Sequence, residues 1–144
     1  MIKKAERKDE EKALSLFKAL WQDADERELK DSFLHSLTGE NLITYLASVQ
    51  GQTAGIAQCS LRRDYVEGTY TSPVGYLEGV FVLPEYRNRG LAKELVKACE
   101  QWAKEKGCKE FASDCELHNE ESRRFHMATG FDEANRIICF VKKI

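Results

Sequence analysis

The apolar positions at the start of the chain recur at helical spacing. From Asp9 to Leu20, apolar side chains fall three or four residues apart, which predicts an amphipathic helix. Glu28 to Leu37 shows the same period, and Gly39 follows it as a residue typical of helix ends. A short strand, Ile2–Ala5, is expected before both helices. The pattern thus predicts a strand followed by a pair of helices.

The pattern then changes to one typical of strands. Leu42–Val49 and Thr53–Leu61 are rich in apolar and β-branched residues and flank a glycine-containing turn at 50–52, so they predict a hairpin. Val74–Val82 predicts a third long strand. Pro84 ends it, because proline has no amide hydrogen to give to a sheet.

The last part of the chain alternates between the two periods. Apolar residues from Leu91 to Trp102 predict an amphipathic helix that Gly107 closes. After it we expect a short strand, a helix that ends at Gly130, and one or two final strands, at Lys109–Ser113, Asn119–Thr129 and Phe131–Val141 respectively.

The predicted order of elements is β-α-α-β-β-β-α-β-α-β-β. Such an order favours an α/β fold of the mixed, α+β-like kind, with a central, mostly antiparallel mixed sheet and helices on both of its faces. The chain has 144 residues and shows no repeat, linker or low-complexity tract, so we expect residues 1–144 to form a single domain.

Composition narrows the function classes. The 24 acidic and 22 basic residues give a net charge of −2, which provides no general attraction to nucleic acid or to an anionic membrane. No apolar run approaches the roughly 20 residues needed to span a bilayer, and the N-terminus becomes charged at once. The five cysteines include no C-x-x-C pair, so we expect free thiols in the cytoplasm and no metal site.

The segment from Val80 to Ala92 carries the strongest chemical signal. A strand ends, a basic turn with Arg87 and Arg89 follows, and a helix begins at Gly90. The first amides of a helix lack intrahelical partners and carry the positive end of the dipole, so a pyrophosphate can bind where no side chain intervenes. The chain contains neither a P-loop nor a G-x-G-x-x-G motif. A solvated basic helix start is the alternative interpretation.

This turn resembles a known signature. Arg87–Ala92 is similar to the coenzyme A motif Gln/Arg-x-x-Gly-x-Gly/Ala of the Gcn5-related N-acetyltransferases (GNAT), and the surrounding strand and helix lie where that family has them. A second family motif is similar to the strand 111–114 and to the helix that precedes Gly130. The strings Asp64–Gly68, Ser72–Val74, Leu77–Pro84 and Ala112–Asp114 resemble those of aminoglycoside 6′-N-acetyltransferases.

The resemblance implies the GNAT fold, acetyl-CoA as cosubstrate and no metal. The backbone of Val80–Val82 is expected to pair with the pantetheine arm, and one of its amides to stabilise the thioester oxyanion. Asn119 is expected to hydrogen-bond the arm, although a helix N-cap explains it equally well. The expected cofactor-binding residues are Val80, Phe81, Val82, Arg87, Asn88, Arg89, Gly90, Leu91, Ala92, Lys93 and Asn119.

Two carboxylates are candidates for the chemistry of the amine. Glu78 lies within an apolar strand, where a carboxylate is unexpected unless it serves a function or faces solvent. Asp114 ends the adjacent strand at the edge where ligands gather in open sheets, and a loop cap is its alternative. By resemblance, both bind the substrate amine, and Asp114 is the candidate general base.

Other positions are expected to bind the substrate or assist the leaving thiolate. The resemblance implies that Trp21, beside the acids 23, 25 and 26, offers a flat face to a sugar ring, and that Tyr65 touches the substrate. His126 stands where many superfamily members have the tyrosine that protonates the thiolate, and it could equally be a structural histidine. Asn135 occupies a position where close relatives have an acid, and an amide is expected to bind an ammonium group less strongly than a carboxylate.

These residues together predict an acetyl-CoA-dependent N-acetyltransferase of a small cationic amine, most specifically the 6′-amine of aminoglycosides. An acetyltransferase of another amine, such as a polyamine or a protein N-terminus, is one alternative. A non-catalytic acyl-CoA sensor is another, which would keep the turn at Arg87–Ala92 without needing Glu78 or Asp114. The resemblance also allows a homodimer.

Overall fold

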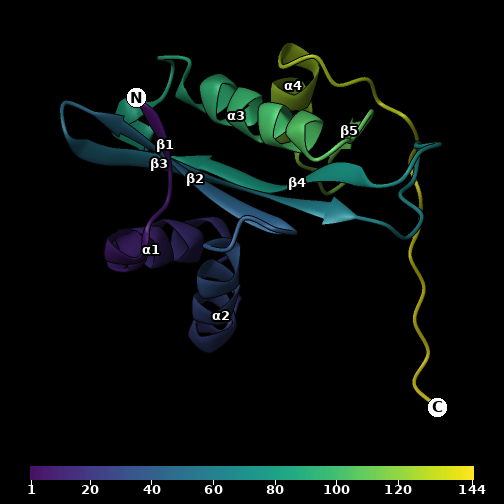
Figure 1. Cartoon of the computed structure of the whole chain (residues 1–144). Helices are drawn as coiled ribbons and strands as arrows, with labels where there is room; N and C mark the ends of the chain where they lie inside the picture. The colour runs from purple at the N-terminus through teal and green to yellow at the C-terminus, as the bar shows by residue number, and fades with distance from the viewer.

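A single five-stranded sheet forms the centre of the protein in the computed structural model, which describes residues 1–144 (Figure 1). The strands lie side by side in chain order. Neighbours are antiparallel except β4 and β5, which are parallel. The strands are β1 (Ile2–Lys4), β2 (Leu42–Val49), β3 (Gln52–Arg62), β4 (Val74–Val82) and β5 (Phe111–Ala112).

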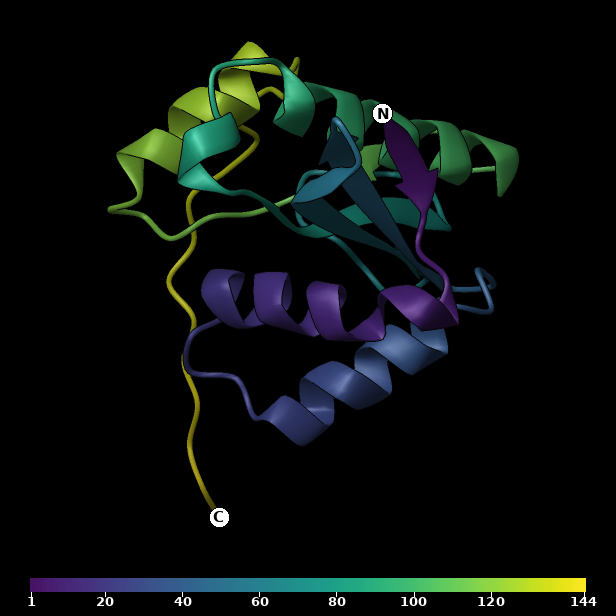
Figure 2. The same cartoon turned by 90° about the vertical axis from the view of Figure 1, so that its left-hand side faces the viewer.

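Helices cover both faces of this sheet, as Figures 1 and 2 show. The helices α1 (Glu10–Leu20) and α2 (Glu26–Ser36) lie on one face, and α3 (Leu91–Glu105) and α4 (Glu120–Ala128) lie on the other. Short 3-10 turns occur at η1 (Arg7–Asp9) and η2 (Pro84–Tyr86). The mixed fold with helices on both faces is confirmed. No helix combines the length and the apolar content that a membrane span requires.

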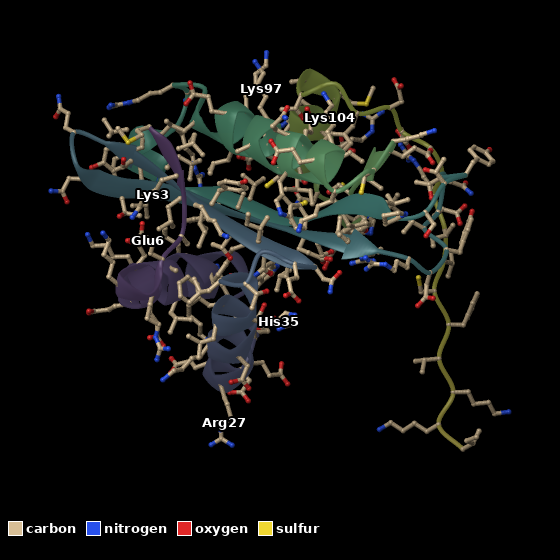
Figure 3. The ribbon with its side chains drawn as sticks, in the orientation of Figure 1. Lys3, Glu6, Arg27, His35, Lys97 and Lys104 are labelled. Carbon is tan, nitrogen blue, oxygen red and sulfur yellow. The ribbon has the colours of Figure 1, made fainter.

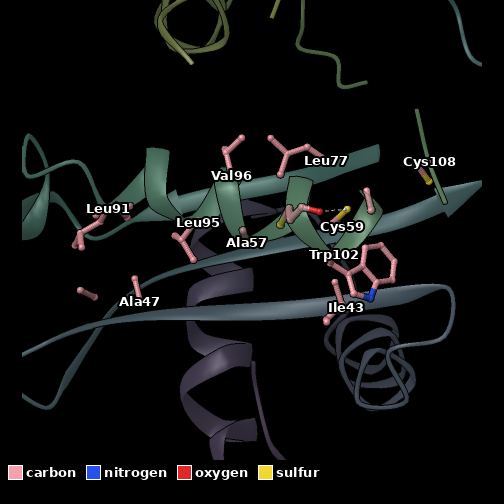
Figure 4. Close-up of a cluster of buried hydrophobic side chains, with 14 residues drawn as sticks. Ile43, Ala47, Ala57, Cys59, Leu77, Leu91, Leu95, Val96, Trp102 and Cys108 are labelled. Atoms are coloured by element: carbon pink, nitrogen blue, oxygen red, sulfur yellow. Dashed lines mark hydrogen bonds between the residues drawn. The ribbon is translucent and has the colours of Figure 1, made fainter. Parts of the chain in front are cut away.

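The core consists of a layer on each side of the sheet. On one side, the apolar face of α3 packs its Leu95, Val96 and Cys99 against the middle strands (Figure 4). On the other side, Phe17 of α1 and Phe33 of α2 are almost fully buried against the sheet. Because β3 is covered on both faces, its centre reads as a continuous buried run rather than an alternation.

Strand β4 contains a bulge at Glu78, one of the candidate site residues. In its pairing with β3, Gln58 lies opposite Gly79 and Cys59 opposite Leu77, so Glu78 is an extra residue without a partner. Such a bulge bends the strand and redirects a side chain. On its other side, β4 pairs with β5 only at Gly75 and Tyr76. The rest of that edge, toward Val82, has no strand beside it.

The C-terminal segment differs from the sequence prediction. We expected one or two strands in Phe131–Val141, and the structure has none there. The chain is held near the body as far as Asn135, whose amide donates to Glu67 over 2.6 Å. It then runs away from the sheet as an extended tail (Figure 1). A strand needs an edge to pair with, and the tail finds none within its own chain.

The helix boundaries differ from the prediction by small shifts with local causes. Helix α2 begins at Glu26 instead of Glu28, because the Asp25 side chain accepts a hydrogen bond from the amide of Arg27 over 3.1 Å and caps the helix. Of the acids near Trp21, Asp25 thus serves as a helix start, which is the structural alternative to a substrate contact. The predicted strand at 109–113 is reduced to the residues of β5.

Asp9 joins the first strand to the first helix. Its side chain is 11% exposed, and Lys3 donates to both carboxylate oxygens over 2.8 and 2.9 Å. The backbone amide of Glu6 donates to the same carboxylate over 2.9 Å. Figure 3 shows Lys3 and Glu6 along this connection. Burial alone would raise the pKa of Asp9, but the hydrogen bonds and charge of Lys3 and the Glu6 amide outweigh it and lower the pKa.

We predict that Asp9→Asn destabilises the protein at neutral pH by about 1–3 kcal/mol, because Lys3 and the Glu6 amide lose a charged acceptor. The folded pKa of Asp9 is lowered, so its contribution is complete above the unfolded pKa of about 3.9 and is lost as pH falls through the folded value. Urea unfolding of wild type and variant between pH 7 and pH 3 measures this. The exposed Asp132→Asn is the control, and a pH-independent difference for Asp9→Asn would contradict the prediction.

Candidate active site

The basic turn before α3 has the backbone that an anion site requires. Asn88 and Gly90 both have positive φ, at 63° and 81°, and Gly90 is the N-cap of α3 without any side-chain cap. The first amides of this helix therefore have no side-chain partner. Residues 87–90 are all exposed, and a Cβ added at Gly90 would meet nothing within 4 Å. The turn thus presents open N–H groups at the positive end of a long helix.

The arginines of the turn are fixed by backbone contacts. Arg87 donates from Nε to the carbonyl of Val82 over 2.8 Å, which ties the turn to the end of β4. Arg89 reaches the carbonyl of Glu85 over 3.4 Å. Each guanidinium also lies 5.5 Å from an aromatic ring centroid, of Phe81 and Tyr86 respectively. Positive charge is therefore held beside the open amides.

The open edge of β4 leads from this turn toward the centre of the sheet. Residues Val80–Val82 lie on that edge, where backbone N–H and C=O groups have no partner strand. Asn119 lies at the start of α4 and accepts a hydrogen bond from the amide of Ser122 over 3.0 Å. Its N-cap interpretation is therefore confirmed, and its contact with a cofactor stays a prediction.

His126 faces the same edge from α4. Its Nδ1 lies 2.7 Å from the carbonyl of Ser122, which can only accept, so Nδ1 carries a proton. Its Nε2 lies 2.8 Å from the hydroxyl of Ser113, and that hydroxyl is also 3.2 Å from the carbonyl of Leu77 in β4. The Ser113 hydroxyl thus connects His126 to the backbone of β4.

Glu78 is neither isolated nor fully solvated. The Ser60 hydroxyl donates to its Oε1 over 2.6 Å. Arg62 donates to the same oxygen from Nε over 3.2 Å and from Nη2 over 2.9 Å, and to Oε2 from Nη2 over 3.0 Å. The Glu78 side chain is 26% exposed and that of Arg62 is 43% exposed. The candidate carboxylate is thus one half of a bidentate ion pair on the α1 side of the sheet.

Asp114 lies just beyond β5 and is exposed. The buried Tyr76 of β4 donates its hydroxyl to Asp114. Burial raises the pKa of Tyr76, and the hydrogen bond and negative charge of Asp114 raise it further, so the phenol stays protonated. The guanidinium of Arg62 lies 3.5 Å from the centroid of the Tyr76 ring. The structure therefore connects both candidate carboxylates through Arg62 and Tyr76.

The loop after α1 brings an aromatic ring to this place. Trp21 stacks on Phe17 with ring centroids 5.2 Å apart. A Cβ added at Gly79 would lie 2.7 Å from the Trp21 ring, so the indole rests directly on the glycine next to Glu78. The absence of a side chain at 79 is what lets the ring approach the strand. Trp21 thus lies beside Glu78 along β4, and its contact with a sugar ring stays a prediction.

Tyr65 and Asn135 meet at a residue that the sequence analysis did not single out. The Tyr65 hydroxyl donates to Oε2 of Glu67 over 3.4 Å, and the Asn135 amide donates to Oε1 over 2.6 Å. Glu67 belongs to the same family-like string as Tyr65, which was the available signal. Tyr65 is 76% exposed and remains open to a ligand.

Four further residues of the site were not predicted from the sequence: Ser60, Arg62, Tyr76 and Ser113. The first two lie two residues apart on β3, and Tyr76 and Glu78 lie two residues apart on β4. That spacing puts them on one face of neighbouring strands, but only the register of the pairing shows that they touch. No group of three or more His, Cys, Asp or Glu side chains is arranged to hold a metal ion.

The sequence profile of the acetyltransferase (GNAT) family matches residues 10–131. The chain therefore belongs to the GNAT acetyltransferase family. Among curated relatives, an aminoglycoside N(6′)-acetyltransferase type 1 of Acinetobacter genomosp. 13 is 44% identical over 133 residues, which are 91% of this chain and 90% of the relative. An enzyme of the same name from Salmonella typhimurium is 44% identical over 107 residues, 74% of each chain.

Solved structures agree with this fold over the whole chain. The aminoglycoside acetyltransferase AAC(6′)-Iy, in complex with the bisubstrate analogue CoA-S-monomethyl-acetylneamine, superposes with a TM-score of 0.95 at 37% identity, covering 100% of this chain and 98% of that one. The 6′-N-acetyltransferase AAC(6′)-Ih of Acinetobacter baumannii gives 0.93 at 39% identity, covering 100% and 98%.

Proposed function

We propose that this protein transfers the acetyl group of acetyl-CoA to the 6′-amino group of aminoglycosides. The chain is an acetyl-CoA-dependent N-acetyltransferase of the GNAT family. One observation carries the choice of acceptor. A solved relative that superposes on the whole chain, AAC(6′)-Iy, holds the bisubstrate analogue CoA-S-monomethyl-acetylneamine. In our structure, an open anion turn and an acidic acceptor face likewise lie along one strand, β4.

Acetyl-CoA supplies the activated acetyl thioester. The open amides at the start of α3 fit a pyrophosphate, with Arg87, Arg89 and Lys93 adding positive charge around it. The extended pantetheine arm can pair with the free edge at Val80–Val82 in the way that an additional strand would. One of the amides of this edge would then stabilise the developing oxyanion.

The acceptor amine is an ammonium ion near neutral pH and must lose a proton before it attacks the thioester. Asp114 and Glu78 lie on the acceptor side of β4 and β5, where carboxylates bind an ammonium and accept its proton, directly or through water. Trp21 offers its ring to a sugar. Tyr65 and Asn135, which both donate to Glu67, form the outer part of the acceptor surface. His126 is our candidate for returning a proton to the thiolate through Ser113.

We predict that aminoglycosides with a 6′-amine, such as kanamycin-type compounds, are acetylated and that 6′-hydroxyl analogues are not. A hydroxyl carries no positive charge for the carboxylates and is a poorer nucleophile. A thiol-release assay over a panel of both classes, with polyamines and an N-terminal peptide included, measures this. Equal turnover of the two aminoglycoside classes would place the acetyl group at another position, and acetyl-CoA binding without any turnover would support the sensor alternative.

We predict that Gly90→Val weakens CoA binding at least about tenfold, because hydrogen bonds to a charged group contribute about 1.5–3 kcal/mol each and depend on close approach to the amides. The positive φ of Gly90 also strains any other residue. Gly107→Val is the matched control, since Gly107 follows the other end of α3 with a φ of 89° and similarly open space. Calorimetry with CoA and thermal unfolding of both variants separates the two effects. Equal affinity in both variants would contradict the pyrophosphate site.

We propose that two copies of the chain form a homodimer through their C-terminal tails. From Ile137 onward the tail is exposed, with Ile138, Phe140 and Val141 between 81% and 95% accessible. Five consecutive apolar residues that leave the body in extended form (Figures 1 and 3) are typical of a strand whose partner lies elsewhere. The outer edge of β5 is free, so the tail of each copy can add to the sheet of the other in a closed pair.

We predict that the wild-type protein is a dimer in light scattering coupled to size-exclusion chromatography, and that Ile138→Asp with Phe140→Asp gives monomers. The reason is that a charge would be buried at each apolar contact of the tail. Lys143→Asp is the control, because it changes the charge of the same tail without removing apolar surface. A monomeric wild type at micromolar concentration would refute the dimer.

We also propose that the protein acts in the cytoplasm. All five of its cysteines are unpaired, and Cys115 and Cys139 are exposed. Exposed thiols persist in a reducing compartment, which supports this location. The acyl donor that the family uses is likewise a metabolite of the cell interior. Fractionation of cells that express the protein tests the assignment.

A further inference from the structure

Five side chains form a continuous chain of contacts across β3, β4 and the end of β5. Ser60 and Arg62 hold Glu78, the Arg62 guanidinium lies on the Tyr76 ring, and the Tyr76 hydroxyl donates to Asp114. We refer to Ser60, Arg62, Tyr76, Glu78 and Asp114 as the acceptor ladder. Arg62 and Tyr76 lie between the two candidate carboxylates and have no assigned role.

The position of Arg62 needs an explanation. A cation beside Glu78 neutralises the carboxylate that should attract an ammonium group, so it opposes substrate binding by simple electrostatics. An arginine in such a place must therefore contribute something other than attraction of the substrate. Its planar fork makes three hydrogen bonds to both oxygens of Glu78, which is a geometry that fixes the direction of a carboxylate.

The bulge shows why Glu78 needs to be fixed. Glu78 is the residue of β4 that has no partner in β3, so the regular pleat of the sheet does not define its direction. Ser60 and Arg62 reach it from β3 and replace that missing constraint. Tyr76 in turn supports the guanidinium with its ring, which is held by burial in the sheet.

We propose that Arg62 is a positioning residue of the acceptor site, acting through Glu78, and that Tyr76 supports Arg62 and positions Asp114. This inference rests on the proposed function, because it assumes that Glu78 and Asp114 face the acceptor amine. It goes beyond that function by assigning the reaction to a coupled ladder instead of two independent carboxylates. A surface ion pair that merely stabilises the β3–β4 hairpin would have the same contacts but no effect on turnover.

A double-mutant cycle between Arg62 and Glu78 tests the coupling. We expect Arg62→Ala to lower kcat at least about tenfold, in line with the cost of a misplaced group, while the KM of the cationic acceptor stays equal or falls because one positive charge is gone. In the Glu78→Gln background, Arg62→Ala should change kcat by less than about twofold, because its target is already lost. Arg62→Lys keeps the charge without the fork, and we expect it to lie between wild type and Arg62→Ala.

Arg63→Ala is the matched control. Arg63 follows Arg62, is exposed, and donates to Asn41 outside the ladder over 2.9 Å. It should keep the wild-type kcat. Melting of both alanine variants checks folding, and the effect of Arg62→Ala on kcat should persist at a temperature where both are fully folded.

A second cycle addresses Tyr76. Tyr76→Phe keeps the ring beneath Arg62 and removes only the hydroxyl that donates to Asp114. We expect it to lower kcat by about threefold or more in wild type and to have no further effect on Asp114→Asn. Tyr76→Leu removes the ring as well, so it should add the loss seen in Arg62→Ala.

Both cycles are run with the best acceptor in the amine panel, which separates the two hypotheses. Wild-type kcat in Arg62→Ala, or effects of Arg62→Ala and Glu78→Gln that multiply, would overturn the ladder and leave the proposed function intact. Coupling measured on a different amine, with aminoglycosides inert, would uphold the ladder and overturn the proposed acceptor. A protein that acetylates no amine would overturn both.

Discussion

The site depends on strand β4 losing its neighbour after Tyr76. Because β5 pairs with β4 only at Gly75 and Tyr76, the edge beyond Leu77 has no partner strand at a place that is half-buried. Unpaired backbone groups are costly unless something binds them. The same divergence leaves room for Ser113 and His126 to approach the carbonyl of Leu77. A regular parallel pairing would close the edge and remove the site.

The second constraint is the separation of charge along β4. Positive charge gathers after the strand, at Arg87, Arg89 and the start of α3. The two candidate carboxylates lie near the middle of the strand, with Glu78 at the centre of β4 and paired with Arg62, and Asp114 just beyond β5. In the proposed function, the anionic donor binds beyond the end of β4 and the cationic acceptor binds near the middle of the strand, with the thioester between them. The net charge of −2 does not show this arrangement, because it is a sum over all charged residues of the chain.

The features that could be predicted from the sequence are those that depend on residues close together in the chain. The family-like turn at Arg87–Ala92 could be recognised because it consists of a local backbone turn, a glycine and a helix start. Most strands and helices followed from period alone, and Asn119 was correctly weighed as an N-cap. Arg62 and Tyr76 could not be found in this way. Their meeting with Glu78 and Asp114 depends on which residues of β3 and β4 lie opposite one another, and the bulge at Glu78 shifts that register by one residue.

The C-terminal tail is a segment for which the hydrophobic pattern alone was not sufficient. Its apolar run predicted one or two strands, and this prediction is wrong for the single chain, in which the segment is extended but unpaired. A hydrophobic pattern indicates that a segment can form a strand, but it does not indicate which strand edge the segment can reach. The hydrogen bond from Asn135 to Glu67 holds the start of the tail at the loop before β4. Glu67 also accepts a hydrogen bond from Tyr65, so the residue that contacts the start of the tail belongs to the candidate acceptor surface. Glu67 therefore contacts both the segment that we propose to form the dimer and a residue that we propose to bind the acceptor, and a substitution there is expected to act on both.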